Sequence, residues 1–200
     1  MKVSDILMLW ARLKTQKVNQ NYRQKLMTDR IFIEDQDLVE KMLSRLTPLN
    51  ESSGWQCELF IDKTTNQKWE KYLFELFDTD DDGIGLRRFP YPSTKEIIRI
   101  ALTSNFFDEI DGACGLLLDM EFDKIEFREM LISEIEKNIN NIDEDRFGII
   151  YNRAELYDTL NKREILGKHF KEIEKDAEYF KELMTKAERL RQKIKQIGNS

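Results

Sequence analysis

Four aspartates that lie close together are the residues of this sequence best suited to chemistry. They are found in the stretch FELFDTDDDGIGLRRFPYP, at Asp78, Asp80, Asp81 and Asp82, and Gly83 follows them. Carboxylate oxygens are ligands that Ca²⁺ and Mg²⁺ prefer, and a D-x-D-x-D-G spacing is typical of a calcium-binding loop. The stretch therefore raises the question of whether Asp78, Asp80 and Asp82 bind a divalent metal.

The first half of this stretch resembles the calcium loop of EF-hand proteins. The resemblance implies that Asp78, Asp80 and Asp82 contribute oxygen ligands to Ca²⁺. The twelfth position of the loop is Phe89, however, where that family has an acidic residue, and Pro90 follows it. Because Ca²⁺ takes roughly six to eight oxygen ligands, a complete loop of this kind is not expected.

A D-x-D-G motif that begins at Asp80 also resembles the nucleophile motif of haloacid dehalogenase phosphohydrolases. That resemblance implies that Asp80 attacks phosphorus, that Asp82 acts as acid and base, and that Mg²⁺ holds the phosphate. Ile84 stands where that family has Thr or Val, and the chain lacks the family's alternation of strands and helices. We favour an acidic turn in which Gly83 and Gly85 supply unusual backbone angles, with calcium or magnesium binding, regulatory or hydrolytic, as the alternative.

A second group of acidic residues occurs in the stretch DEIDGAC, at Asp108, Glu109 and Asp111. Asp108 and Asp111 can share one side of a helix, and together with the aspartate stretch they could form a metal site. We favour the simpler interpretation that these acids begin a helix, where the helix dipole favours acidic side chains.

Other catalytic groups are scarce in the chain. His169 is the single histidine, which excludes the common zinc hydrolase sites. Cys57 and Cys114 lie far apart without a CxxC motif, which fits a reducing cytoplasm better than a disulfide framework. Glycine-rich phosphate loops and the G-x-S-x-G motif are also absent. We therefore expect no enzymatic activity and no cofactor.

The distribution of charge indicates the kind of partner. The net charge is −6, and residues 31–150 carry 13 basic against 27 acidic side chains. An acidic middle repels phosphate backbones and attracts basic proteins, so a basic protein is the expected partner and nucleic acid is not. The sequence contains no run of 18 apolar residues, so we expect no membrane partner and a cytoplasmic location.

Hydrophobic spacing predicts helices over most of the chain. Apolar residues recur three and four positions apart, as on one buried face of a helix, and Ser93 with Glu96 forms a capping box. The predicted helices cover residues 5–14, 38–46, 94–103, 105–118 and 123–139.

Two further stretches complete the predicted secondary structure. Residues 55–61 alternate apolar and polar side chains, which predicts a strand, with a small β-hairpin over 55–74 as one option. Residues 68–77 fit both a helix and a strand, and we favour the helix. From Leu166 to Ile194 apolar residues follow a 4-3-4-3 spacing, which predicts one long helix over 168–197. This helix either packs on the rest of the protein or forms a homodimer seam.

Short loops between the predicted helices of residues 93–139 force neighbouring helices to run antiparallel. With its small residues Gly112, Ala113 and Gly115, the stretch FFDEIDGACGLLLDME resembles the second helix of a HEAT-type unit. We therefore predict a mainly α fold of HEAT-like antiparallel helical hairpins, with that small β-hairpin and a long C-terminal helix. Residues 1–150 would form the helical domain and 151–200 its C-terminal extension.

As a small, acidic, helical chain rich in Ile, Asn and Lys, the protein resembles the bacterial immunity proteins that neutralise toxins. The resemblance implies a protein-interaction module that binds a basic toxin through an acidic face. Charge would speed the encounter and select the partner. The residues predicted to contact the partner are Asp78, Asp80, Asp81, Asp82, Asp108, Glu109 and Asp111.

Overall fold

The computed structural model describes residues 29–51, 57–75 and 82–198 of the protein. Its strands are β1 (Phe32–Ile33), β2 (Thr47–Pro48), β3 (Glu58–Asp62), β4 (Gln67–Glu75) and β5 (Asp82–Phe89). Its helices are α2 (Gln36–Leu43), α3 (Thr94–Thr103), α4 (Phe107–Phe122), α5 (Arg128–Lys137), α6 (Glu144–Arg153) and α7 (Phe170–Gly198), with a 3-10 turn η1 at Ile139–Asn141. The predicted helix over 5–14 lies outside the described residues.

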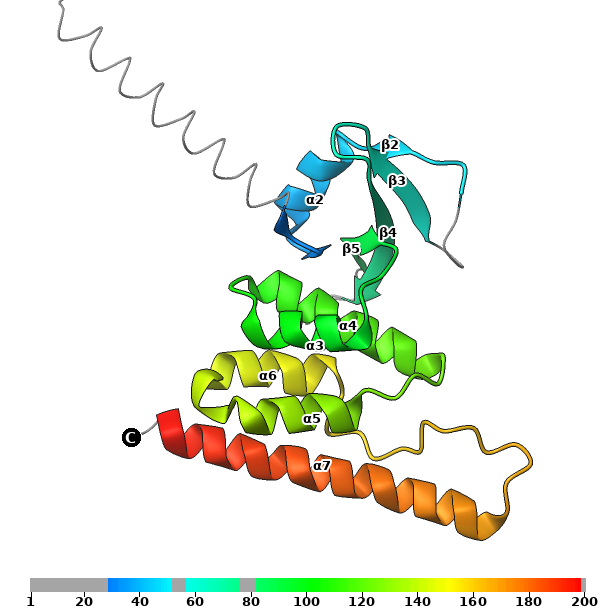
Figure 1. Cartoon of the computed structure of the whole chain (residues 1–200), viewed down its shortest axis with the longest axis vertical. Coiled ribbons are helices and arrows are strands. Elements are labelled where there is room, and N and C mark those ends of the chain that lie inside the picture. The colour runs from blue at the N-terminus through cyan, green and yellow to red at the C-terminus, as the bar shows by residue number, and fades with distance from the viewer. Residues whose placement is uncertain (1–28, 52–56, 76–81, 199–200) are drawn as a thin grey trace, which may run out of the picture.

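The elements form successive layers (Figure 1). A sheet with α2 lies at one end, the pair α3 and α4 follows, then α5 and α6, and α7 closes the other end. The sheet is antiparallel and has the strand order β1-β5-β4-β3-β2.

This sheet makes the prediction of a mainly α fold of helical hairpins wrong. Of the residues that the structure describes, 55% are helix and 16% strand, which is a mixed α/β composition. The predicted hairpin is present as β3 and β4, which pair from Glu58–Lys71 to Asp62–Gln67 around the polar turn at residues 63–66. The sheet extends further because β5 pairs with β4 along eight residues and because short edge strands join on both sides.

The helix predicted for residues 68–77 is also wrong, because residues 67–75 form β4. Trp69 is buried on the side of α2, whereas Glu70 and Tyr72 are buried on the side of α4. A strand places alternate side chains on opposite faces, so both layers can be filled from one segment. The pairing with β3 and β5 decides between two patterns that fit the sequence equally well.

Two glycines of β5 make room for aromatic rings rather than for a turn. Gly85 lies opposite Tyr72 and Gly83 opposite Phe74, and a Cβ at either glycine would overlap the facing ring. Among the described glycines only Gly167 has a positive φ, so the predicted unusual backbone angles at Gly83 and Gly85 are wrong. Here the lack of a side chain matters, not the freedom of the backbone.

The helical layers follow several sequence predictions closely. The capping box is confirmed: the Ser93 hydroxyl accepts a hydrogen bond from the N–H of Glu96, and α3 ends at Thr103 as predicted. Helix α5 begins at Arg128, so its predicted start near Asp123 is wrong. The residues between α4 and α5 form a connection, which proves important for the site described below.

The long C-terminal helix is confirmed as α7, a helix of 29 residues. Its apolar stripe lies in the same core as the buried residues of α3 to α6. The apolar stripe that could have formed a homodimer interface therefore packs against helices of the same chain. Its buried residues are Phe180, Leu183, Ala187, Leu190 and Ile194.

Candidate functional site

The acidic residues predicted at the start of α4 hold the chain that leads into β1 and α2. Asp108 pairs with Arg30 at 2.6 Å and accepts hydrogen bonds from the backbone N–H groups of Glu34 and Asp35 at 3.2 Å each. Glu109 accepts hydrogen bonds from the N–H of Ile31 at 2.7 Å and from the hydroxyl of Ser104 at 2.6 Å. Both carboxylates therefore have extensive contacts within the chain.

Asp111 belongs to a buried polar cluster between the sheet and the helices. It pairs with Arg153 at 3.0 Å and is hydrogen-bonded to the carboxyl group of Glu34, which also accepts a 2.7 Å hydrogen bond from the Tyr72 hydroxyl. Burial and the adjacent Asp111 raise the pKa of Glu34 to about 9. The Glu34 carboxyl group is therefore protonated at neutral pH, since its charged form would be desolvated and close to another carboxylate.

The aspartate stretch that motivated the metal hypothesis is described only at its end. Asp82 is exposed at the start of β5, whereas Asp78, Asp80 and Asp81 lie outside the described residues. Within residues 29–51, 57–75 and 82–198 no group of three or more His, Cys, Asp or Glu side chains is arranged to hold a metal ion. Metal binding by Asp78, Asp80 and Asp82 stays a prediction.

A different region of the protein has a backbone fixed by many polar contacts and large apolar side chains exposed to solvent. It is the connection between α6 and α7, called here the α6–α7 segment (residues 154–169), which contains no regular secondary structure. A connection of this length inside a compact fold is uncommon and is often functional. The segment extends from the end of α6 away from α5 and α6 and leads to the start of α7 (Figure 1).

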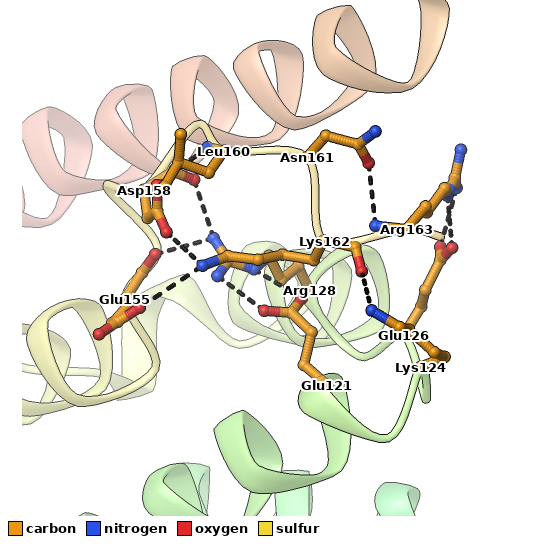
Figure 2. A network of polar contacts seen from close by, with 10 residues as sticks. All are labelled: Glu121, Lys124, Glu126, Arg128, Glu155, Asp158, Leu160, Asn161, Lys162 and Arg163. Carbon is orange, nitrogen blue, oxygen red and sulfur yellow. Dashed lines mark hydrogen bonds and ion pairs between the residues drawn. The ribbon is translucent and has the colours of Figure 1, made fainter. Parts of the chain in front are cut away.

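The buried guanidinium of Arg128 attaches this segment to the helical core (Figure 2). Arg128 pairs with Glu121 through two hydrogen bonds of 2.8 Å each, and both side chains are at most 4% exposed. Its Nη1 donates to the backbone carbonyls of Glu155 at 2.8 Å and Asp158 at 3.0 Å. One side chain thus satisfies a buried carboxylate and fixes the path of the backbone.

Two further cations extend the same network. Lys162 pairs with Asp158 inside the segment, while its backbone carbonyl accepts a 3.2 Å hydrogen bond from Lys124 (Figure 2). Arg163 contacts Glu126 with both Nε and Nη2 and pairs with Asp176 of α7 at 2.8 Å. The segment is therefore attached to the α4–α5 connection on one side and to α7 on the other.

Large apolar side chains of the same segment face solvent. Leu160 is 68% exposed, Ile165 55% and Leu166 87%, and Phe170 at the start of α7 is 66% exposed. Phe122 at the end of α4 and Ile125 in the adjoining α4–α5 connection are also exposed. We call these six residues the apolar surface: Phe122, Ile125, Leu160, Ile165, Leu166 and Phe170.

A small cavity marks the junction between the two connections. It has a volume of about 190 Å³ and is lined by Leu118, Phe122, Asn161 and Lys162 among others. Asn161 accepts a hydrogen bond from the N–H of Arg163, but its buried Nδ2 has no acceptor among the described residues. An unsatisfied buried donor costs about 1–3 kcal/mol.

Sequence reasoning did not find this site. The predictions treated Leu166 and Phe170 as the beginning of the α7 stripe and assigned Arg128 no role. The available signal was the apolar content of the stretch NKREILGKHF, whose Gly167 breaks the helical spacing. His169, predicted as a surface residue, is exposed. Its backbone N–H donates a hydrogen bond to the carboxylate of Glu172.

Comparisons with known proteins give no relative for this chain: no protein-family model, no curated protein and no solved structure matches it. Among the described residues no helix is both long enough and apolar enough to cross a membrane.

Proposed function

We propose that this protein is a non-enzymatic protein-interaction module that binds a basic protein through the apolar surface. The observation that carries the proposal is the combination of exposure and attachment in the α6–α7 segment. Leu160 and Leu166 are more than two-thirds exposed, although Arg128 and Arg163 fix the backbone that carries them.

Exposed apolar side chains that an ordered segment holds in place are typical of protein-binding sites. Because the segment is already ordered, its binding requires little additional loss of conformational entropy. Affinity would come from a few apolar side chains near the centre of the interface.

The charge of the protein supports a basic partner. The chain carries a net charge of −6, and the excess of acidic residues lies in its middle region. Long-range attraction to a basic protein would increase the rate of encounter, while the apolar surface would determine the lifetime of the complex. The biological role that we propose is neutralisation of a basic toxin, as in the immunity proteins that the sequence resembles.

The test compares three forms of the full chain: wild type, Leu160→Ser/Leu166→Ser and Leu73→Ser. Leu73 is a matched control because it is an exposed leucine on β4, away from the apolar surface. Proteins captured by the wild type from the source cells are identified and purified, and their affinities for the three forms are measured by calorimetry.

We expect a basic protein that binds the wild type and Leu73→Ser equally well and the double variant about 100-fold more weakly, since central interface residues each contribute about 1–2 kcal/mol. Co-expression with that protein should relieve its toxicity only for the forms that bind. Equal affinity for all three forms, or capture of no specific protein, would refute the proposal.

A further inference from the structure

The last part of the α6–α7 segment contains a tight turn with an exposed leucine at its corner. The N–H of Lys168 donates a 3.2 Å hydrogen bond to the carbonyl of Ile165, and Gly167 has a φ of +77°. A positive φ at the third position of a four-residue turn favours glycine. Leu166 therefore occupies the second position of this turn. We call residues 163–168 the tip.

A single carboxylate of α7 holds both ends of the tip. One oxygen of Asp176 pairs with Arg163 at 2.8 Å, and the other oxygen pairs with Lys168 at 2.7 Å. The Asp176 side chain is only 13% exposed, and ion pairs that are partly shielded from water are stronger than fully exposed ones. Asp176 therefore joins the first and last residues of the tip.

Glu164 fixes the backbone between those two ends. Its carboxylate accepts hydrogen bonds of 3.0 Å each from the backbone N–H groups of Leu166 and Ile165. These two hydrogen bonds hold the pKa of Glu164 below its usual value, so the carboxylate is charged at neutral pH. The tip is thus ordered before a partner binds, which reduces the entropy that binding must cost.

The apolar side chains on and beside the tip contact little of the chain. Leu166 is 87% exposed and Ile165 55%, and Phe170, two residues after the tip, is 66% exposed. The segment extends away from α5 and α6 before α7 begins (Figure 1). A flat surface would cover only one side of a side chain as exposed as Leu166. Its complete burial therefore requires a concave apolar pocket on the partner.

The charges of the tip indicate the polar groups at the rim of such a pocket. Arg163 and Lys168 are the two cations of the tip, and both pair with Asp176. Glu164 is exposed, and its carboxylate forms no ion pair with any residue that the structure describes. The charge that the tip offers to a partner is therefore negative, and a cation on the partner would be complementary to it.

We propose that the tip inserts Leu166 into a concave apolar pocket of the partner, with a Lys or Arg at the rim of that pocket paired with Glu164. Ile165 and Phe170 contact the walls of the pocket. Asp176 is a positioning residue, which holds Leu166 at the corner of the turn without contacting the partner. This inference rests on the proposed function, because it names the shape and charge of the surface that binds the apolar surface.

β-Cyclodextrin tests the shape of the tip without the partner, because this ring-shaped sugar has a concave apolar cavity. It is titrated into the full chain while methyl signals are followed by NMR. We expect saturable shifts at Leu166 and Ile165. Leu73 is the matched control, since it is exposed but lies on β4 beside Ile84 of β5. Its shifts should be at least tenfold smaller. Absent shifts at Leu166, or equal shifts at Leu73, would overturn the insertion of Leu166.

The basic protein identified by the capture experiment provides the second test. Leu166→Ala should weaken its binding at least tenfold, and Asp176→Asn several-fold. If Asp176 acts only through Leu166, Asp176→Asn should have no further effect in the Leu166→Ala variant. Independent effects of the two changes would overturn the positioning role. A thermal melt shows that each variant is folded.

Leu160→Ser separates this inference from the proposed function, because Leu160 belongs to the apolar surface but lies outside the tip. Weaker binding by Leu160→Ser together with unchanged binding by Leu166→Ala would overturn the inference and leave the proposed function standing. Capture of no basic protein would overturn both.

Glu164→Gln tests the charge at the rim of the pocket. Its amide keeps an oxygen for the N–H groups of Ile165 and Leu166, so the turn is retained while the negative charge is removed. Association with the basic protein should become several-fold slower, and high ionic strength should reduce the difference. Equal association rates at low ionic strength would overturn the proposed pairing of Glu164 with a cation of the partner.

Discussion

Arg128 and Glu121 form a bidentate ion pair in which both side chains are almost completely buried, and the same guanidinium donates to two backbone carbonyls of the α6–α7 segment. The relationship links the helical core to the candidate interaction surface. A buried ion pair is costly to break because the remaining partner keeps its desolvated charge. The order of the segment therefore depends on a contact formed in the interior of the protein.

Replacing Arg128 with methionine should destabilise the protein by about 3–5 kcal/mol, because Glu121 is left buried without its partner. Urea unfolding measures this change. Arg99→Met is the matched control: Arg99 forms the same kind of pair with Glu96, but on the surface. Exposed pairs contribute about 0–1 kcal/mol, so the control should change little. Similar losses for the two variants would contradict the assigned role of burial.

The double variant Glu121→Met/Arg128→Met separates stability from the order of the segment. Removing both charges should recover much of the lost stability, because no unpaired charge remains. The carbonyls of Glu155 and Asp158 would still lack their donor, so the segment should open more often. We expect faster tryptic cleavage after Lys162 and Arg163 in native conditions. Wild-type cleavage rates in this variant would show that Arg128 does not fix the segment.

Glu34 gives the protein a pH dependence of a defined sign. The pKa of Glu34 is about 9 in the folded protein against an ordinary value of 4.5, so the folded state binds the proton more tightly. The resulting stability is fully present below pH 4.5 and is lost as the pH rises through 9. Arg153, Asp111 and Tyr72 face this carboxyl group, and Cys114 lies near it.

Glu34→Gln removes this titration, and its neutral amide keeps an oxygen for the Tyr72 hydroxyl. Between pH 5 and pH 9 the wild type should therefore lose stability relative to Glu34→Gln, at up to about 1.4 kcal/mol per pH unit. Unfolding free energies measured at several pH values supply the comparison. Glu58→Gln, a change at an exposed position, controls for the loss of a carboxylate. Parallel pH profiles for wild type and Glu34→Gln would rule out a buried proton at this position.

Substitutions at Asp108 and Asp82 test whether the acidic residues predicted to contact the partner stabilise the fold instead. Asp108 pairs with the buried Arg30 and accepts two backbone N–H groups, whereas Asp82 is exposed. Asp108→Asn should cost about 1.5–3 kcal/mol, the range for hydrogen bonds to charged groups, and Asp82→Asn less than about 0.5 kcal/mol. Chemical denaturation of both variants measures the difference. Equal, small effects would instead make Asp108 available for a partner.

The sequence predicted the elements that local spacing and capping determine. Helix α3 was found through Ser93, and α7 through its apolar stripe. The sheet was underestimated because Trp69, Tyr72 and Leu73 have helical spacing, whereas Tyr72, Phe74 and Leu76 alternate as in a strand. Only the pairing of β4 with β3 and β5 decides between the two patterns. Likewise, the sequence showed that Asp108 and Asp111 carry charge. It could not show that they form ion pairs with Arg30 and Arg153, which are distant in sequence.

Replacement of glycine by alanine should have opposite effects on stability at Gly85 and at Gly148. At Gly85 a Cβ would overlap the ring of Tyr72, which cannot move freely because its hydroxyl donates to Glu34 at 2.7 Å. Gly85→Ala should therefore destabilise the protein by about 1–3 kcal/mol through overpacking. At Gly148 the space is open, and Gly148→Ala should stabilise α6 by roughly 0.5–1 kcal/mol. Thermal unfolding of the two variants gives both signs, and a stabilising Gly85→Ala would show that the Tyr72 ring does not lie over β5.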